Sequence, residues 1–242
     1  MTALVTGAGG AIGAAIVQQL LTEGQRVIAQ DIRAESLTQF RETNVSTVVG
    51  DLLNSECADQ LGRAIIEQPI DRVIAAHGID GSGALAGTDQ NFVRRVMAIN
   101  AATIPALLAI TRKALSASGG VLMIVDSQAG LLAERDNVAY CASKFAVVGW
   151  ARIMRPILAD EGIALRLFCP GCTETPLLFA AQERFAAAQG LQPDDFLRRR
   201  RAHIPIQRFA RVEQTAAGAC YLATPGIHTP FVLAATGGEV LY

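Results

Sequence analysis

Short runs of apolar and β-branched residues alternate with longer segments of helical periodicity along the chain. The apolar runs predict strands at residues 3–6, 26–32, 47–52, 72–76, 121–127, 164–169 and 231–235. The periodic segments predict helices at 14–21, 34–43, 54–67, 89–117, 137–161 and 211–224. The run from Val121 to Val125 is apolar at every position, which is typical of a strand buried on both faces of a parallel sheet. We therefore predict an α/β fold: a Rossmann-like, doubly wound parallel sheet of about seven strands with helices on both faces.

Residues 1–242 form a single domain in this interpretation, because no linker, repeat or low-complexity segment divides them. The segment 176–205 breaks the alternation, and a long insertion at the carboxyl end of a parallel sheet is typical of a lid over a ligand site. Its arginines at 198–201 either receive an anionic substrate or form a solvated helix face. Its apolar residues either line a substrate pocket or pack against the body; they are Leu177, Leu178, Phe179, Phe185 and Phe196.

Composition favours a compact soluble protein, with 51% hydrophobic and 18% charged residues. The formal net charge of −1 gives no reason to expect nucleic acid or an anionic membrane as a partner. No unbroken apolar run approaches the roughly 20 residues that span a bilayer, and the first residues lack the features of a signal peptide. Five cysteines, an odd number, fit reduced thiols, so we expect a cytoplasmic protein. Cys169 and Cys172 have the spacing of a metal or redox pair, but without a second pair or a nearby histidine we expect no metal.

A glycine-rich turn connects the first predicted strand to the first helix. It reads Thr6-Gly7-Ala8-Gly9-Gly10-Ala11-Ile12-Gly13. Glycine permits a tight turn and close approach of the backbone, and the helix N-terminus attracts a pyrophosphate. The turn therefore predicts a dinucleotide site at Gly7, Gly10, Ala11, Ile12 and Gly13, the alternative being a tight turn without a ligand.

Acidic residues end the second and third predicted strands. Asp31 lies near the offset at which an acid holds the adenosine ribose hydroxyls, and a carboxylate there repels a 2′-phosphate. This favours NAD over NADP, although the nearby Arg33 either pairs with that phosphate or is simply exposed. Asp51 and Leu52 either reach the adenine, or the acid caps the following helix.

Candidate proton chemistry lies further along the chain. The sequence has three tyrosines and two lysines against nineteen arginines, and Tyr140 and Lys144 share a helix face at i and i+4. An ammonium beside a phenol lowers the tyrosine pKa from about 10 toward neutrality. Ser127 ends the fifth predicted strand, where its hydroxyl can orient a substrate carbonyl. Asn100 either holds a water that connects Lys144 to solvent or is a buried residue bonded to a helix carbonyl.

Taken in order, these motifs resemble the short-chain dehydrogenase/reductase family across essentially the whole chain. The resemblance implies a catalytic set of Asn100, Ser127, Tyr140 and Lys144, and a homodimer or homotetramer that assembles through helices 89–117 and 137–161. It also implies that the Thr173 backbone meets the nicotinamide carboxamide and that Thr175 meets the pyrophosphate. Further cofactor contacts implied by the resemblance are Ile32, Ala76, Gly78, Tyr140, Lys144, Pro170 and Gly171.

The chain departs from the family pattern at several positions. Ala11 replaces a glycine of the turn, and Ala75-Ala76-His77-Gly78 stands where the family usually has Asn-Asn-Ala-Gly. His77 is either a second proton-transfer group or, as we favour, a packing or cofactor-contact residue. Asp126 precedes Ser127 where serine is frequent, and strand alternation predicts that its side chain points away from the site in a structural role.

We therefore expect an NAD-dependent oxidoreductase that interconverts a secondary alcohol and a ketone, with Tyr140 as general acid and base. A small molecule is then its substrate, and neither nucleic acid nor a membrane is a partner. The alternative is a catalytically silent NAD-binding regulatory or scaffold protein on the same fold.

Overall fold

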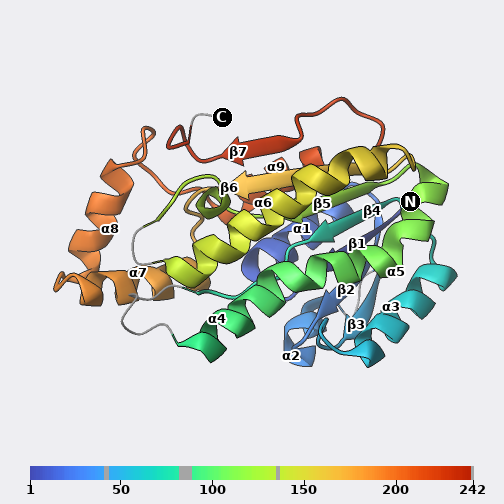
Figure 1. The fold of residues 1–242 in the computed structure, drawn as a ribbon, viewed down its shortest axis with the longest axis horizontal. Coiled ribbons are helices and arrows are strands. Elements are labelled where there is room, and N and C mark those ends of the chain that lie inside the picture. Colours follow the sequence, from blue (N-terminus) through green and yellow to red (C-terminus); the bar gives the residue numbers. More distant parts are fainter. Residues whose placement is uncertain (41–43, 82–88, 135–136, 241–242) are drawn as a thin grey trace.

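The computed structural model describes residues 1–40, 44–81, 89–134 and 137–240. Its centre is one sheet of seven parallel strands in the order β3-β2-β1-β4-β5-β6-β7 (Figure 1). The predicted Rossmann-like architecture is confirmed. The strands are β1 (Thr2–Thr6), β2 (Arg26–Asp31), β3 (Val45–Val49), β4 (Arg72–Ala75), β5 (Val121–Val125), β6 (Ala164–Pro170) and β7 (Val232–Ala235).

Helices cover both faces of the sheet, and each face has its own apolar core. On one face α3 (Ser55–Glu67), α5 (Thr103–Ser118) and α6 (Val138–Ala159) pack on the strands. On the other face lie α1 (Ala11–Thr22) and α9 (Val212–Leu222). The remaining helices are α2 (Ala34–Leu37), α4 (Gln90–Met97), α7 (Pro176–Ala188) and α8 (Pro193–Ala202), with 3₁₀ turns at Thr38–Phe40 and Gln128–Gly130 and a π-helical turn at Ala98–Ala102.

The third strand differs from its predicted bounds of 47–52, because the chain leaves the sheet at Gly50. A side chain at Gly50 would lie 2.8 Å from the Cβ of Cys57, so the first turn of α3 packs directly on this glycine. Asp51 and Leu52 consequently lie in the connection to α3 rather than in the strand. The predicted helix 34–43 is described to Phe40 and consists of α2 and a 3₁₀ turn; its last three residues lie outside the described part.

The continuous helical stretch Gln90–Ser118 is long and apolar enough to cross a membrane by length and composition alone. The expectation that the chain has no such segment was based on unbroken apolar runs, and this stretch passes a broader test. A core helix passes the same test, and Ile104, Leu107 and Leu115 of this stretch are buried in the core against the sheet.

The strand order reverses between β1 and β4, which are neighbours in the sheet but are separated in sequence by β2 and β3. Parallel α/β sheets bind ligands at the carboxyl ends of their strands beside such a switch point. The segment predicted as a lid forms α7 and α8, which lie together at one end of the molecule (Figure 1).

Candidate active site

A cavity of about 1030 Å³ lies along the carboxyl ends of the strands. The turns after β1, β4, β5 and β6 line it together with α6, α7 and α8. This volume is at the upper end of the range for small-molecule and cofactor sites. The predicted site residues that line it are Gly10, Ala11, Ile12, Gly13, Ala76, Gly78, Ser127, Tyr140, Lys144, Pro170, Gly171, Thr173 and Thr175. Six others do not line it: Gly7, Asp31, Ile32, Asp51, Leu52 and Asn100.

The glycine-rich turn places the start of α1 at the cavity. Gly7 has a left-handed backbone with φ +65°, and a Cβ there would lie 2.6 Å from the Cα of His77. A Cβ on Gly13 would lie 2.1 Å from the Gly7 carbonyl oxygen. The N-cap residue Gly10 provides no side-chain cap for α1, so the amides of the first turn remain available to an anion. Both glycines thus serve the turn itself, and the amides after Gly10 are the groups that can meet a pyrophosphate.

Asp31 lies behind the glycine-rich turn. Its Oδ2 accepts a hydrogen bond from the Gly9 amide at 2.9 Å, and its Oδ1 accepts one from the Arg33 amide at 3.0 Å. The exposed Arg33 guanidinium lies 3.6 Å from Oδ1 and lines the cavity. The end of β2 therefore presents an acid held by backbone amides and an exposed cation beside it.

Asp51 and Ile32, both predicted as cofactor contacts, do not line the cavity. Asp51 accepts a hydrogen bond from the Leu53 amide at 2.9 Å, which closes a turn before α3. The N-cap of α3 is Asn54, so Asp51 does not cap the helix directly. Ile32 is 60% exposed beyond the end of β2.

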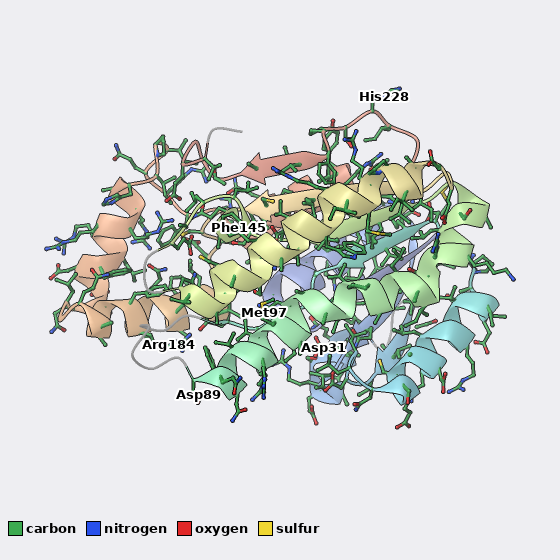
Figure 2. The ribbon with its side chains drawn as sticks, in the orientation of Figure 1. Asp31, Asp89, Met97, Phe145, Arg184 and His228 are labelled. Carbon is green, nitrogen blue, oxygen red and sulfur yellow. The ribbon has the colours of Figure 1, made fainter. Side chains whose placement is uncertain are left out.

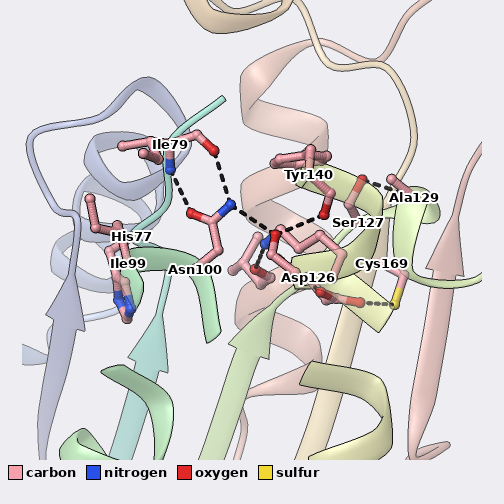
Figure 3. A network of polar contacts seen from close by, with 12 residues as sticks. His77, Ile79, Ile99, Asn100, Asp126, Ser127, Ala129, Tyr140 and Cys169 are labelled. Carbon is pink, nitrogen blue, oxygen red and sulfur yellow. Dashed lines mark hydrogen bonds and ion pairs between the residues drawn. The ribbon is translucent and has the colours of Figure 1, made fainter. Parts of the chain in front are cut away.

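Tyr140, Lys144 and Ser127 converge at the cavity from α6 and from the chain after β5. The Lys144 ammonium lies 5.6 Å from the centre of the Tyr140 ring and donates to the Val125 carbonyl at 3.2 Å. The Ser127 hydroxyl oxygen accepts the Ala129 amide at 3.1 Å, so the hydroxyl proton remains available to another acceptor (Figure 3). The three groups thus combine a proton donor, a cation and a second hydroxyl.

The pKa of Tyr140 departs from expectation. Burial raises it above its usual value of 10.0, and this effect outweighs the lowering by the Lys144 ammonium and by the Ser127 hydroxyl. The carboxylates of Asp126 and Glu134 raise it further. Lys144 thus lowers this pKa as expected, but burial outweighs the lysine, and the phenol holds its proton at neutral pH.

Asn100 ties two parts of the site together from the π-helical turn. Its Oδ1 accepts the Ile79 amide at 2.8 Å, and its Nδ2 donates to the Ile79 carbonyl at 3.0 Å and to the Ser143 hydroxyl at 3.1 Å. Its carbonyl partner thus follows β4 and is not in a helix. Asn100 fixes the loop after β4 against α6, next to Lys144, and π turns of this kind are frequent at functional sites.

His77 bridges β1 and α5 beneath the cavity. Its Nδ1 lies 2.7 Å from the Thr6 hydroxyl and its Nε2 lies 2.7 Å from the Thr103 hydroxyl. Thr103 gives its proton to the Ile99 carbonyl, so Nε2 is the donor and Nδ1 accepts from Thr6. Burial first, and then the Lys144 charge, lower the pKa of His77 to about 4. The ring is neutral and both of its nitrogens are hydrogen-bonded, which agrees with the packing role that we favoured.

The prediction that Asp126 points away from the site is wrong. Its Oδ1 lies 3.8 Å from the Lys144 ammonium, and the carboxylate is fully buried. The thiol of Cys169 on β6 lies 3.8 Å from Oδ2 (Figure 3). Asp126 lies beyond Val125, the last residue of β5, so strand alternation does not govern its direction.

Part of the lid charge is neutralised within the protein. Arg198 pairs with Asp195 at 2.6 Å, Arg200 pairs with Glu239 at 2.7 Å, and the Arg201 guanidinium lies over the Phe209 ring. Arg184 of α7, labelled in Figure 2, pairs with Asp80, which lines the cavity. Of the run 198–201, Arg199 and Arg200 line the cavity, and Arg199 is exposed.

Four polar residues that line the cavity had no signal in the sequence: Gln128, Glu134, Asn137 and Gln182. Glu134 accepts hydrogen bonds from Gln128 at 3.0 Å and from Asn137 at 2.6 Å. Gln128, Asn137 and Gln182 each retain a buried side-chain oxygen that accepts no hydrogen bond from the described residues. Their positions depend on loop packing, so periodicity offered no signal.

No group of three or more metal-binding side chains occurs in the described ranges. Burial raises the pKa of both thiols of the Cys169–Cys172 pair, to about 11 for Cys172. Protonated thiols are poor nucleophiles and poor metal ligands.

Known proteins resemble this chain in sequence and in structure. The family described as short chain dehydrogenase matches residues 1–184. The chain is 32% identical to 3beta-hydroxysteroid dehydrogenase 2 of Eggerthella lenta, over 72% of this chain and 71% of that protein. It is 31% identical to D-threitol dehydrogenase of Mycolicibacterium smegmatis, over 92% and 85%. A crystal structure of an actinorhodin polyketide ketoreductase variant with NADPH has a TM-score of 0.91 at 28% identity, and covers 100% of this chain and 97% of that chain.

Proposed function

We propose that this chain, which belongs to the short-chain dehydrogenase family, interconverts a secondary alcohol and a ketone with NAD(H). Members of this family are oxidoreductases that bind a nicotinamide cofactor and act on small-molecule alcohols and ketones. One observation carries the proposal: Tyr140, Lys144 and Ser127 line the same cavity as the uncapped start of α1. A dinucleotide whose pyrophosphate meets α1 has room to extend toward Tyr140 in this cavity.

The residues present fit such a cofactor. The first-turn amides of α1 offer donors to a pyrophosphate, and no acidic side chain lies in that turn to repel it. Thr173 and Thr175 follow the Pro170-Gly171 corner on the other wall of the cavity. The Thr175 hydroxyl is the N-cap of α7, where it accepts the Leu178 amide at 3.1 Å. It thereby fixes the start of the lid over the cofactor end.

The end of β2 supports NAD rather than NADP as the cofactor. Asp31 is 6% exposed and fixed by two backbone amides, and a buried anion at this place disfavours a 2′-phosphate. Arg33 is the competing feature, since a guanidinium can pair with that phosphate. In this structure Arg33 lies beside Asp31, which offsets its charge.

In ketone reduction, the Tyr140 hydroxyl donates its proton to the carbonyl oxygen, and the Ser127 hydroxyl donates a hydrogen bond to the same oxygen. A nicotinamide held in this cavity would supply the hydride in this direction and would accept it in the other. Lys144 stabilises the negative charge left on the Tyr140 oxygen until a proton returns from solvent. In alcohol oxidation the same oxygen, deprotonated, removes the hydroxyl proton. Because burial keeps Tyr140 protonated at neutral pH, oxidation should become faster as the pH rises.

We also propose that the protein is a homo-oligomer that assembles through α6. Three large apolar residues, Phe145, Ile153 and Ile157, are 45%, 69% and 44% exposed and share one face of this helix by their spacing. Phe145 is seen on the outer side of the body in Figure 2. Exposed apolar stripes of this kind are typical of contacts between protein chains.

The central test is a screen of secondary alcohols and ketones with both nicotinamide cofactors, followed by Tyr140→Phe. We expect turnover in the wild type, a loss of at least about a hundredfold in the variant, and NADH affinity within about twofold of wild type. Retained turnover in Tyr140→Phe contradicts the assigned role. A wild type that binds NADH but turns over none of the panel favours the silent binding protein instead.

A further inference from the structure

Asp126 brings a buried negative charge to the lysine of the proposed proton-transfer pair. Its Oδ1 lies 3.8 Å from the Lys144 ammonium, with the two side chains 0% and 5% exposed. Oδ1 accepts no hydrogen bond from any residue in the described part of the chain. The ammonium compensates the carboxylate charge, and the Ser127 backbone amide also stabilises the charged form. A buried carboxylate is costly unless a charge or donors compensate it, which makes this pairing a specific feature of the site.

The surroundings accommodate a carboxylate at this place. A Cβ on Gly130 would lie 2.3 Å from the Asp126 Oδ2 and 3.1 Å from the Lys144 carbonyl oxygen. The glycine thus leaves room for the acid between the 3₁₀ turn and α6. On the other side the Cys169 thiol donates weakly to Oδ2 at 3.8 Å.

Several charged or titratable groups act on this pair from the elements around it. Tyr140 and Lys144 come from α6, Cys169 from β6 and Glu134 from the loop after β5. His77, at the end of β4, feels the Lys144 charge but stays neutral because burial lowers its pKa to about 4. Burial raises the pKa of Asp126 to about 6 despite the lysine, so the carboxylate is charged at neutral pH. Its charge in turn raises the pKa of Tyr140.

We propose that Asp126 is a positioning residue that acts through Lys144: its buried carboxylate offsets the ammonium and so keeps the proton on the Tyr140 oxygen to higher pH. The inference rests on the proposed role of Tyr140 as general acid and base. It follows that alcohol oxidation, which needs the deprotonated oxygen, becomes fast at a higher pH than Lys144 alone would set. The ammonium also donates a hydrogen bond to the Val125 carbonyl, a contact that does not involve Asp126.

The direct test titrates the Tyr140 phenol without any substrate. Tyrosinate difference absorbance is recorded against pH, and subtraction of the Tyr140→Phe signal removes Tyr221 and Tyr242. The variants are Asp126→Asn and Asp126→Ser. Cys169→Ala is the matched control, because it disturbs packing against the same carboxylate but leaves its charge.

We expect the Tyr140 midpoint to fall by about one pH unit in both Asp126 variants, a tenfold rise in the tyrosinate fraction on the acid side. Cys169→Ala should move it much less. The pH at which alcohol oxidation reaches half its maximal rate should fall with the midpoint, on whichever alcohol of the screen is turned over. A midpoint that is unchanged or higher in the Asp126 variants overturns the proposal, as does an equal shift in Cys169→Ala.

A second measurement needs no Asp126 variant and so stands even if both variants fail to fold. The infrared band of a protonated carboxyl should grow in the wild type as the pH falls through about 6. Lys144→Met should move that midpoint upward, since the ammonium no longer favours the carboxylate. An identical midpoint in Lys144→Met would show that the pair does not interact. The failure of the proposed function is seen separately, as turnover that survives Tyr140→Phe.

Discussion

The neutral state of His77 predicts how the free energy of unfolding depends on pH. Its imidazole has an ordinary pKa of 6.5 in an unfolded chain and a pKa of about 4 in the fold, because burial between Thr6 and Thr103 disfavours the charged form. The unfolded chain therefore binds the extra proton first as the pH falls. The stability that His77 contributes is complete above pH 6.5 and is lost progressively as the pH falls toward 4.

The magnitude follows from the separation of the two pKa values. Between pH 6.5 and pH 5, a span of about 1.5 units, only the unfolded chain binds the proton. At about 1.36 kcal/mol per pH unit, the free energy of unfolding falls by about 2 kcal/mol over this span. That figure is an upper value, because one edge of the ring lines the cavity and water there reduces the penalty. At neutral pH, His77→Gln should cost about 1 kcal/mol, for one of two hydrogen bonds lost. The variant should therefore match or exceed the stability of the wild type at pH 5.

The assay is urea unfolding at pH 7 and pH 5 for the wild type, His77→Gln and the control His228→Gln. His228 lies in the exposed loop before β7 (Figure 2), so its replacement should reproduce the pH dependence of the wild type. Comparison of variants is essential, because Asp126 has a raised pKa and titrates in the same range in all three proteins. If the free energy of unfolding changes equally with pH in the wild type and in His77→Gln, then His77 is not a neutral histidine with two hydrogen bonds in the fold.

Three further predictions concern the cofactor, the substrate and the assembly. Asp31→Ser should raise NADPH affinity about tenfold relative to NADH in fluorescence titrations, since the anion that repels the 2′-phosphate is gone; an unchanged preference contradicts the role of Asp31. Arg199→Ala should raise KM about tenfold for anionic ketones only, whereas Arg198→Ala, whose arginine already pairs with Asp195, should not; an equal effect on neutral ketones rejects anion recognition. Ile153→Glu should yield a smaller species than the wild type by size-exclusion chromatography with light scattering. The control Ile66→Glu, at an exposed apolar position on α3, should not change the size. A wild type that is already monomeric refutes assembly through α6.

The sequence by itself determined the architecture and identified the reactive groups that meet at the cavity. Apolar runs such as Val121 to Val125 predicted a two-sided parallel sheet, because burial on both faces leaves no polar position in a strand. The glycine-rich turn, Ser127, Tyr140 and Lys144 could be identified because local rules fix them: a turn that needs glycine, a strand end, and a helix face repeated at i+4.

Only the tertiary structure decided how these groups affect one another. Asp126 looked structural from strand alternation, yet the chain leaves β5 one residue earlier and the carboxylate turns toward Lys144. The pKa of Tyr140 depends on the balance between burial and a nearby ammonium, and the sequence shows only the ammonium. The environment of a side chain is set by elements distant in sequence, as His77 shows between Thr6 and Thr103. Desolvation and charge pairing act through space, so spacing along the chain could name the reacting groups but could not set their proton affinities.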